Sequence, residues 1–289
     1  MKTKRFSLIA LAAAGMLALA ACSGAGPGAE STPTAKPTFA AGTTMAKLAD
    51  AGKITIGTKF DQPLFGLVGP SGKPEGFDVE IGTLIASKLG IPADKIEWKE
   101  AVSANREPFI QNGDVDIVVA TYTINDKRKA VVDFAGPYYT AGQSILVKAD
   151  NTSIKSDKDL VGQPVCSVTG STPAAKLTEI GAKPLLTDTY SNCLEPLRNG
   201  QAVAVSTDNV ILAGLAAQNE GEFKIVGKPF TAEPYGIGLK KGDTEFRTFI
   251  NDVLEKAYED GSYKKAWEDT AGKVLPYVEP PAVDRYSAS

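Results

Sequence analysis

The segment that decides the fold is a buried strand and the polar run after it, Asp116-Ile117-Val118-Val119-Ala120-Thr121-Tyr122-Thr123-Ile124-Asn125-Asp126-Lys127-Arg128. A short apolar run bounded by turn signals predicts a strand over 116–121. Thr121, Thr123 and Arg128 follow its carboxyl end, the edge at which open α/β sheets bind their ligands. An arginine there can hold a carboxylate with two hydrogen bonds. The alternative is an exposed Arg128 at a helix start, where the helix dipole does not favour a cation.

The rest of the chain alternates predicted strands and helices. Short β-type runs predict strands over 53–58, 96–99, 144–148, 165–168 and 202–207. Apolar residues recur on one face of two predicted helices, 77–89 and 246–258, and Gly113 is expected to end a third over 108–112. This alternation favours an α/β fold with mainly parallel sheets.

The composition excludes several kinds of chemistry. The 289 residues include 31 Lys and Arg, 34 Asp and Glu and no His, which gives a formal net charge of −3. A nucleic-acid-binding protein would usually carry a basic surplus, so no nucleic-acid partner is expected. Without His there is no Ser-His-Asp or Cys-His system and no His-bound zinc, and three Cys cannot form a four-Cys site. We expect no catalytic residue, no metal and no cofactor.

The first residues have the pattern of an export signal. A basic start, an apolar stretch and a small-residue exit predict a signal peptide over 1–21. The exit Leu19-Ala20-Ala21-Cys22 resembles the lipobox of bacterial lipoproteins, which would place a diacyl anchor on Cys22 and the protein on the outer face of the cell membrane. The alternative is an ordinary signal peptide with an incidental Cys. Residues 22–46 are rich in Gly, Pro, Ser and Thr, which predicts a flexible linker.

A second candidate anion site lies in the turn Gly170-Ser171-Thr172-Pro173. It follows a predicted strand, and Thr172 is expected to be the N-cap of a helix with Pro173 at its first position. The free N–H groups of that terminus suit a small carboxylate or phosphate, although the phosphate-loop pattern of nucleotide-binding proteins is absent. Simple helix capping explains the same residues.

Four motifs occur in an order that resembles one family. They are Gly76-Phe77-Asp78-Val79-Glu80-Ile81, the run from Ala120 to Arg128, Asp133-Phe134-Ala135-Gly136-Pro137-Tyr138-Tyr139, and the turn at 168–172. Together they resemble the bacterial extracellular solute-binding proteins of family 3, which bind polar amino acids for ABC importers. The resemblance covers about residues 50–275 and implies a type II periplasmic-binding-protein-like fold of two α/β lobes. It places lobe 1 at 47–141 plus 236–278, lobe 2 at 142–235 and a tail at 279–289, with hinge crossings near 140–144 and 231–236.

The same resemblance assigns roles to individual residues. It implies that Arg128 binds the ligand's α-carboxylate with Thr121 and Thr123, and that Gly170, Ser171 and Thr172 meet that carboxylate from lobe 2. Asp208, which follows a predicted strand end, would accept the α-ammonium; the alternative is a turn at Asp208-Asn209.

The choice of substrate depends on Lys59 and Arg106. Both resemble basic residues that bind a side-chain carboxylate, which favours glutamate over aspartate, glutamine or asparagine, although each could be a solvated surface charge. Since the chain has no His, affinity should change little between pH 5 and 8 unless a cleft carboxyl group is strongly shifted.

The remaining predictions concern covalent structure and partners. In an exported protein, Cys166 and Cys193 are the two Cys left after Cys22 and are expected to pair, with two buried thiols as the alternative. The expected partners are an amino acid, an ABC permease and the membrane through the lipid, and the chain is expected to be monomeric. An enzyme resembling cyclohexadienyl dehydratase and a sensor module are the other functions that the fold allows.

Overall fold

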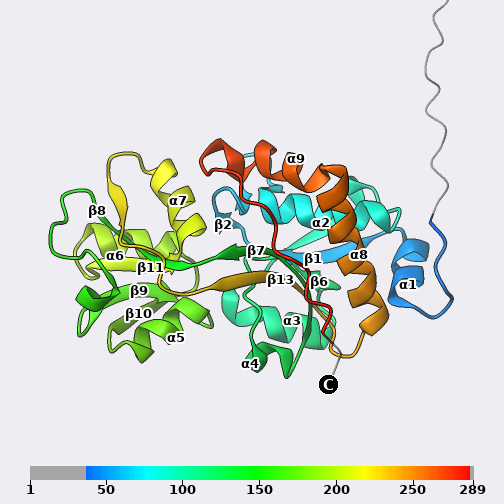
Figure 1. Ribbon diagram of the computed structural model, residues 1–289, viewed down its shortest axis with the longest axis horizontal. Coiled ribbons are helices and arrows are strands. Elements are labelled where there is room, and N and C mark those ends of the chain that lie inside the picture. Colours follow the sequence, from blue (N-terminus) through cyan, green and yellow to red (C-terminus); the bar gives the residue numbers. More distant parts are fainter. Residues whose placement is uncertain (1–36, 287–289) are drawn as a thin grey trace, which may run out of the picture. The chain divides into compact units, whose positions relative to one another are not determined.

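The computed structural model describes residues 37–286, and two five-stranded sheets organise them (Figure 1). Cys22 and the predicted signal peptide therefore lie outside the described residues, as does most of the predicted linker. We call the part built on the first sheet lobe 1 and the part built on the second lobe 2. Among the described residues, no helix is long and apolar enough to cross a membrane.

The sheet of lobe 1 has the strand order β5-β1-β6-β13-β7. Its strands are β1 (Ile54–Thr58), β5 (Ile96–Glu100), β6 (Ile117–Val118), β7 (Asp133–Ala141) and β13 (Glu233–Leu239). β1 is parallel to β5 and β6, whereas β13 pairs antiparallel with β6 and β7. A small sheet also belongs to this lobe, formed by β2 (Asp61–Gln62), β3 (Gly66–Val68) and β4 (Pro74–Glu75).

Helices cover both faces of this sheet. Figure 1 shows α2, α8 and α9 on one face and α3 and α4 on the other. The helices of lobe 1 are α1 (Thr44–Ala51), α2 (Phe77–Lys88), α3 (Arg106–Asn112), α4 (Asp126–Lys129), α8 (Thr244–Asp260) and α9 (Ser262–Asp269). Gly113 ends α3 in the left-handed conformation, as predicted. Short 3₁₀ turns are η1 (Ala93–Lys95), η2 (Ser103–Asn105) and η5 (Ala271–Lys273).

Lobe 2 repeats the pattern with the strand order β10-β9-β11-β8-β12. Its strands are β8 (Gln143–Lys148), β9 (Pro164–Val168), β10 (Lys183–Thr187), β11 (Ala204–Asp208) and β12 (Phe223–Val226). Its helices are α5 (Thr172–Glu179), α6 (Leu194–Arg198) and α7 (Asn209–Gln218), with 3₁₀ turns η3 (Asp157–Leu160) and η4 (Ser191–Cys193). β9 is parallel to β10 and β11, but β8 pairs antiparallel with β11 and β12.

Both sheets are therefore mixed, although the α/β class and the two lobes are as predicted. The antiparallel strands are those next to the crossings, because the chain leaves lobe 1 through β7 and returns through β13, and these two strands pair with each other. The two crossing segments touch at Gly142, where a Cβ would lie 2.7 Å from Thr231 O and leaves no room for a side chain.

The core of lobe 1 is rich in aromatic side chains. Trp267 on α9 stacks on Tyr139 with ring centroids 5.1 Å apart and meets the edge of Phe77 at the same distance. Phe65 contacts both Trp267 and Phe77 and is fully buried. Rings of this size bury much apolar area and prefer these edge-to-face and offset arrangements, so they fix α2 and α9 against the strands.

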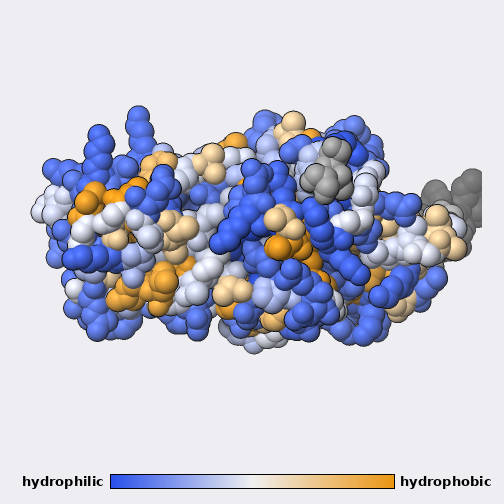
Figure 2. All heavy atoms as spheres, turned by 90° about the horizontal axis from the view of Figure 1, so that it is seen from below, coloured by the Kyte–Doolittle hydropathy of each residue, from blue (hydrophilic) through white to orange (hydrophobic). Residues whose placement is uncertain are grey.

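The surface shows no comparable apolar cluster on the face drawn in Figure 2. That face is largely hydrophilic, and its apolar residues are gathered in separate small patches. The described end of the chain packs against lobe 1, where Tyr286 Oη accepts the N–H of Phe134 and the N–H of Asp284 donates to Gly136 O.

A disulfide joins Cys166 on β9 to Cys193 in η4, with a Cα–Cα distance of 5.5 Å. The predicted pairing is confirmed. It connects the strand that leads into the Gly170–Thr172 turn with the segment that carries Tyr190, so one covalent bond supports two loops of the cleft.

Candidate ligand-binding cleft

A small cavity of about 10 Å³ lies between the two lobes. Lobe 1 and lobe 2 contribute Ser103, Arg106, Thr121, Thr123, Ser171, Thr172, Pro173, Tyr190, Asp208 and Ile211. A cavity of this size holds about one water, so the lobes must separate before an amino acid can enter. The structure thus shows the closed arrangement, and it brings six of the predicted site residues to one cavity.

Direct hydrogen bonds hold the lobes together around this cavity. Asp61 Oδ2 in lobe 1 accepts the N–H groups of Tyr190 and Ser191 in lobe 2, at 2.9 and 3.3 Å. Arg128 Nη2 donates to Gly170 O at 3.1 Å. These contacts exist only when the lobes are closed, and they therefore favour the closed state.

Arg106 is held rigidly at the start of α3. Its Nη1 donates to Ala120 O at 3.1 Å and to Thr121 O at 3.4 Å, and its Nε donates to Ser103 O at 3.3 Å. The guanidinium lies over the ring of Tyr122, 4.3 Å from its centroid. Among the described residues, no hydrogen bond or ion pair uses its Nη2. Arg106 therefore lines the cavity with its Nη2 donors available to a ligand.

Lys59 lies behind the cavity rather than on its wall. It follows β1, is 3 % exposed, and donates from Nζ to Ser103 Oγ at 2.9 Å. In the part of the chain that the structure describes, no carboxylate lies within ion-pair distance of its Nζ. Burial, followed by the charge of Arg106, lowers the pKa of Lys59 to about 7. Ser103 lines the cavity and accepts this hydrogen bond, so it connects Lys59 to the cavity wall.

Arg128 is already partly engaged. Its Nε donates to Glu107 Oε1 at 3.1 Å, and its Nη1 donates to Thr123 O at 2.7 Å. With the bond to Gly170, three of the five guanidinium donors are occupied, and two remain for a carboxylate. Asn125 caps α4 by accepting the Arg128 N–H, which fixes where the side chain starts.

Asp208 is the last residue of β11 and is 3 % exposed. Its Oδ2 accepts the hydroxyl of Tyr235 at 2.6 Å, whereas its Oδ1 has no partner among the described residues. Burial, followed by the charge of Glu233, raises the pKa of Asp208 to about 7. A buried acceptor without a partner is costly, and a ligand ammonium would satisfy it.

The turn Gly170–Thr172 behaves differently from the sequence prediction in one respect. The N-cap of α5 is Ser171, not Thr172, because Ser171 Oγ accepts the Ala174 N–H at 3.1 Å. Thr172 Oγ1 instead donates to Glu233 Oε2 at 2.7 Å. Gly170 has φ 78°, and a Cβ there would lie 2.8 Å from Ala104 Cα. Glycine is therefore required both for the turn and for the approach of the lobes.

Sequence reasoning missed Ser103, Tyr190 and Ile211, which line the cavity, and Asp61, which joins the lobes. The spacing of Ser103, three residues before Arg106, was the only signal available for any of them. Tyr190, Ile211 and Asp61 come together with the other lobe only when the lobes close, and no local sequence pattern predicts that closure.

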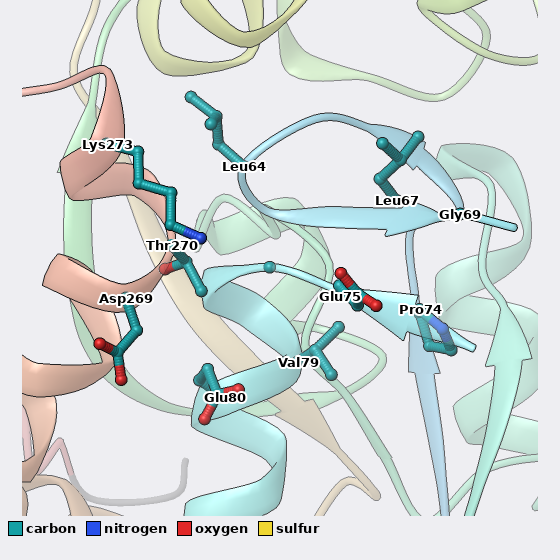
Figure 3. Close-up of a pocket in the computed structure, with 11 residues that line it drawn as sticks. Leu64, Leu67, Gly69, Pro74, Glu75, Val79, Glu80, Asp269, Thr270 and Lys273 are labelled. Carbon is teal, nitrogen blue, oxygen red and sulfur yellow. The ribbon is translucent and has the colours of Figure 1, made fainter. Parts of the chain in front are cut away.

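A wider pocket lies away from this cleft, on lobe 1 alone (Figure 3). It opens between α2, the β3–β4 turn and the end of α9, and Glu75, Glu80, Asp269 and Lys273 are among its lining residues. It contains none of the predicted site residues, so its larger size does not make it the amino-acid site.

Two α/β lobes enclose a cavity lined by a buried Arg106 and by Asp208, whose Oδ1 has no partner among the described residues; charges of both signs in one cavity are typical of proteins that bind small molecules between two lobes. Residues 54–270 match the family model described as bacterial extracellular solute-binding proteins, family 3, and the chain belongs to this family.

Curated relatives carry related names. The chain is 44% identical over 234 residues to the glutamate-binding protein GluB of Corynebacterium efficiens, covering 77% of this chain and 80% of the relative. It is 40% identical over 269 residues to the ABC transporter glutamine-binding protein GlnH of Bacillus subtilis, covering 92% and 96%. The protein is therefore an amino-acid-binding protein of the ABC-importer class.

Solved structures agree with this assignment. A solute receptor for L-cysteine from Neisseria gonorrhoeae superposes with a TM-score of 0.77 at 31% identity, covering 83% of this chain and 99% of that one. An ancestral arginine-binding protein bound to glutamine gives a TM-score of 0.72 at 39% identity, covering 76% and 97%. These likenesses confirm the two-lobed α/β fold.

Proposed function

We propose that the protein is an exported, lipid-anchored receptor that captures glutamate between its lobes and delivers it to an ABC permease. The assignment of glutamate as the substrate rests on two side chains, Arg106 and Lys59. Both side chains are buried, at 2 % and 3 % exposure, and within the described residues neither forms an ion pair. Uncompensated buried cations are costly, and a second carboxylate on the ligand would compensate them.

The remaining groups fit the backbone part of the ligand. Arg128, which contacts Thr123 and Gly170, has donors left for the α-carboxylate. The cavity itself is lined by Thr121, Thr123, Ser171 and Thr172. The unpartnered Oδ1 of Asp208 would accept the α-ammonium. The site thus offers two cationic regions and one anionic group, which is the charge pattern complementary to glutamate at neutral pH.

Glutamine is the second candidate. A relative at 40% identity is named as a glutamine-binding protein, and a pKa near 7 allows Lys59 to become neutral beside an uncharged amide. Neutralising Lys59 and Arg106 should weaken the binding of glutamate more than that of glutamine, so the ratio of the two affinities distinguishes the candidates.

The experiment is isothermal titration of the twenty amino acids into wild type and into Lys59→Met with Arg106→Gln. We expect wild type to prefer glutamate, and the double variant to lose at least about tenfold more affinity for glutamate than for glutamine. A control pair, Lys73→Met with Lys127→Gln, changes two exposed cations and should leave the ratio unaltered. An unchanged ratio in the cleft variant would remove the support for glutamate.

The anchor and the receptor role have separate tests. Cys22→Ser should block lipidation and leave unprocessed precursor. If this variant matures normally and still fractionates with the membrane, the lipid anchor on Cys22 is refuted. We also propose that the protein turns over no ligand and acts as a monomer. Incubation with amino acids and with prephenate-type substrates checks the first point, and light scattering checks the second.

A further inference from the structure

Thr121, at the end of the strand that the sequence singles out, has an unusual backbone. Its φ is 45°, and Leu64 is the only other non-glycine residue with positive φ in the described part of the chain. A β-branched residue seldom adopts this conformation, because its Cβ substituents crowd the neighbouring carbonyl. Such strain persists only where the surroundings over-determine it, and it is frequent at ligand sites.

The surroundings that hold Thr121 centre on the carboxylate of Asp78. Oδ2 of Asp78 accepts the Thr121 N–H at 2.7 Å, and Oδ1 accepts the hydroxyl of Tyr138 at 2.6 Å. Asp78 is fully buried in the first turn of α2, where its own N–H donates to Phe65 O. Both carboxylate oxygens are thus used inside lobe 1, and Asp78 does not line the cavity.

This hydrogen bond affects the cleft through two backbone carbonyl groups, one before the Thr121 N–H and one after it. Ala120 O and Thr121 O both accept from Nη1 of Arg106. Their directions depend on the backbone angles of Thr121, because φ and ψ set where each flanking peptide points. Asp78, Thr121 and Arg106 therefore form a chain of contacts that ends at the guanidinium facing the ligand.

We propose that Asp78 is a positioning residue for ligand selection, which keeps Thr121 in its left-handed conformation and thereby aims Arg106 at the ligand side chain. The proposal rests on the proposed function in one respect, namely that Arg106 receives that side chain. Asp78 acts on Thr121 as a hydrogen-bond acceptor, since its oxygens bind the Thr121 N–H and the Tyr138 hydroxyl. Asparagine, whose amide group has nearly the same shape as a carboxyl group, should therefore be able to replace Asp78.

The test compares Asp78→Ala with Asp78→Asn by titration of glutamate and glutamine. Ala removes the acceptor, and we expect glutamate affinity to fall at least about tenfold while the glutamate-to-glutamine ratio moves towards one. Asn keeps one carbonyl oxygen for the Thr121 N–H, and we expect it to retain both affinity and ratio within about threefold.

A matched control separates positioning from general stability. Asp116 Oδ2 accepts the N–H of Thr55 at 2.8 Å, which is the same kind of bond in the same lobe, away from the cleft. Asp116→Ala should lower the melting temperature and leave the ratio unchanged. If Asp78→Ala lowers the melting temperature but not the ratio, as the control does, Asp78 is only structural and the proposal is overturned.

A double variant tests the link through Thr121 and guards against poor folding of Asp78→Ala. Glycine adopts positive φ without strain, so Thr121→Gly should need Asp78 less. We expect Asp78→Ala to reduce affinity clearly less in the Thr121→Gly background than in wild type. Equal losses in both backgrounds would contradict the proposal.

The two proposals can fail separately. If wild type binds glutamine more tightly than glutamate, the glutamate assignment fails. The coupling between positions 78 and 121 is then measured with glutamine, and it still supports or overturns the role of Asp78. If wild type prefers glutamate and the Asp78→Ala ratio stays at the wild-type value, only the positioning role fails.

Discussion

The carboxylate of Asp61 in lobe 1 accepts the backbone N–H of Tyr190 in lobe 2 at 2.9 Å, and that of Ser191 at 3.3 Å. These bonds cross the cleft beside the cavity and cannot form when the lobes are apart. Tyr190 also lines the cavity, so ligand contact and lobe closure meet at one segment. The disulfide at Cys193 ties this segment to β9.

Asp61→Ala should therefore weaken binding without touching the ligand. Hydrogen bonds to a charged group contribute about 1.5–3 kcal/mol each, and a less populated closed state lowers the apparent affinity. We expect a loss of at least about tenfold for both glutamate and glutamine, by titration. Asp188→Ala, an exposed carboxylate in lobe 2 close to Tyr190, is the control and should bind like wild type. Unchanged affinity in Asp61→Ala would show that these bonds do not drive closure.

Arg128→Ala should weaken every amino-acid ligand. Removing one partner of a buried charge pair costs about 2–5 kcal/mol, and here Glu107 also loses its ion pair. We expect at least about a tenfold loss that is similar for glutamate and glutamine, since both have the same α-carboxylate. The neighbouring exposed Lys127→Ala should have no effect. A loss confined to glutamate would instead assign Arg128 to the side-chain carboxylate.

Affinity should fall as the pH falls below about 7, because Asp208 must be ionised to receive an ammonium. The pKa of its carboxyl group is raised to about 7, so at lower pH the ligand must first displace a proton. The limiting slope is about tenfold per pH unit. The charged groups that act on it are Glu233, which raises its pKa, and Arg106 and Arg128, which lower it.

Titration at pH 5, 6 and 7 measures this slope in wild type and in Asp208→Asn. The variant should bind more weakly at pH 7 and show a flatter profile. Asp116 lies outside the cleft, and burial also raises the pKa of its carboxyl group. The control variant Asp116→Asn should therefore keep the wild-type slope. A flat wild-type profile would contradict a shifted Asp208.

Loss of the disulfide should lower stability. Closing a loop over a sequence separation of 27 contributes about 3 kcal/mol in the chain-entropy model, which corresponds to roughly 6–12 °C in melting temperature for a chain of this size. Cys166→Ala with Cys193→Ala should show this decrease in scanning calorimetry. Added reductant should not lower the variant further, and equal melting temperatures for variant and wild type would disprove the contribution.

Local sequence patterns predicted much of the fold because they report burial directly. The apolar run at 116–121 and the one-sided helix over 246–258 correspond to β6 and α8. The mixed sheets were missed, since the strands that cross the hinge carry the same apolar pattern as parallel ones. Pairing direction depends on the route of the chain, not on the residues within a strand.

The site shows the same division. Arg128 and Asp208 were predicted because each follows a buried strand; Asp208 lines the cavity, and Arg128 contacts Thr123, which also lines it, and Gly170. Asp61 and Tyr190 could not be found in this way, because they meet only when the lobes close. Ser103 lies in lobe 1 beside Lys59 and Arg106, and only its spacing to Arg106 pointed to it. The N-cap was misplaced by one residue because Ser171 and Thr172 are both common N-cap residues; in the structure Ser171 caps α5 and Thr172 contacts Glu233.

Affinity for glutamate should also fall as the pH rises above about 7, because Lys59 must be protonated to attract the distal carboxylate. Burial and Arg106 lower its pKa to about 7, so above that pH Lys59 is largely neutral, and glutamate binding must be accompanied by the uptake of a proton at Lys59. The other charges that act on Lys59 are Asp61 and Asp78, which raise its pKa, and Arg128, which lowers it. The flat profile predicted from the absence of His required that no cleft carboxyl group be strongly shifted, and the raised pKa of Asp208 does not meet that condition.

Titration of glutamate and glutamine at pH 7, 8 and 9 tests this limb. Wild type should lose glutamate affinity by up to about tenfold per pH unit while glutamine affinity changes less. Lys59→Met should bind glutamate weakly and without this slope, whereas Lys59→Arg keeps a charge at pH 9 and should bind glutamate equally at all three values. Lys127→Met, at an exposed position, should retain the wild-type profile. If glutamate and glutamine respond identically in wild type, Lys59 does not interact with the ligand side chain, and Arg106 alone would have to select the acidic ligand.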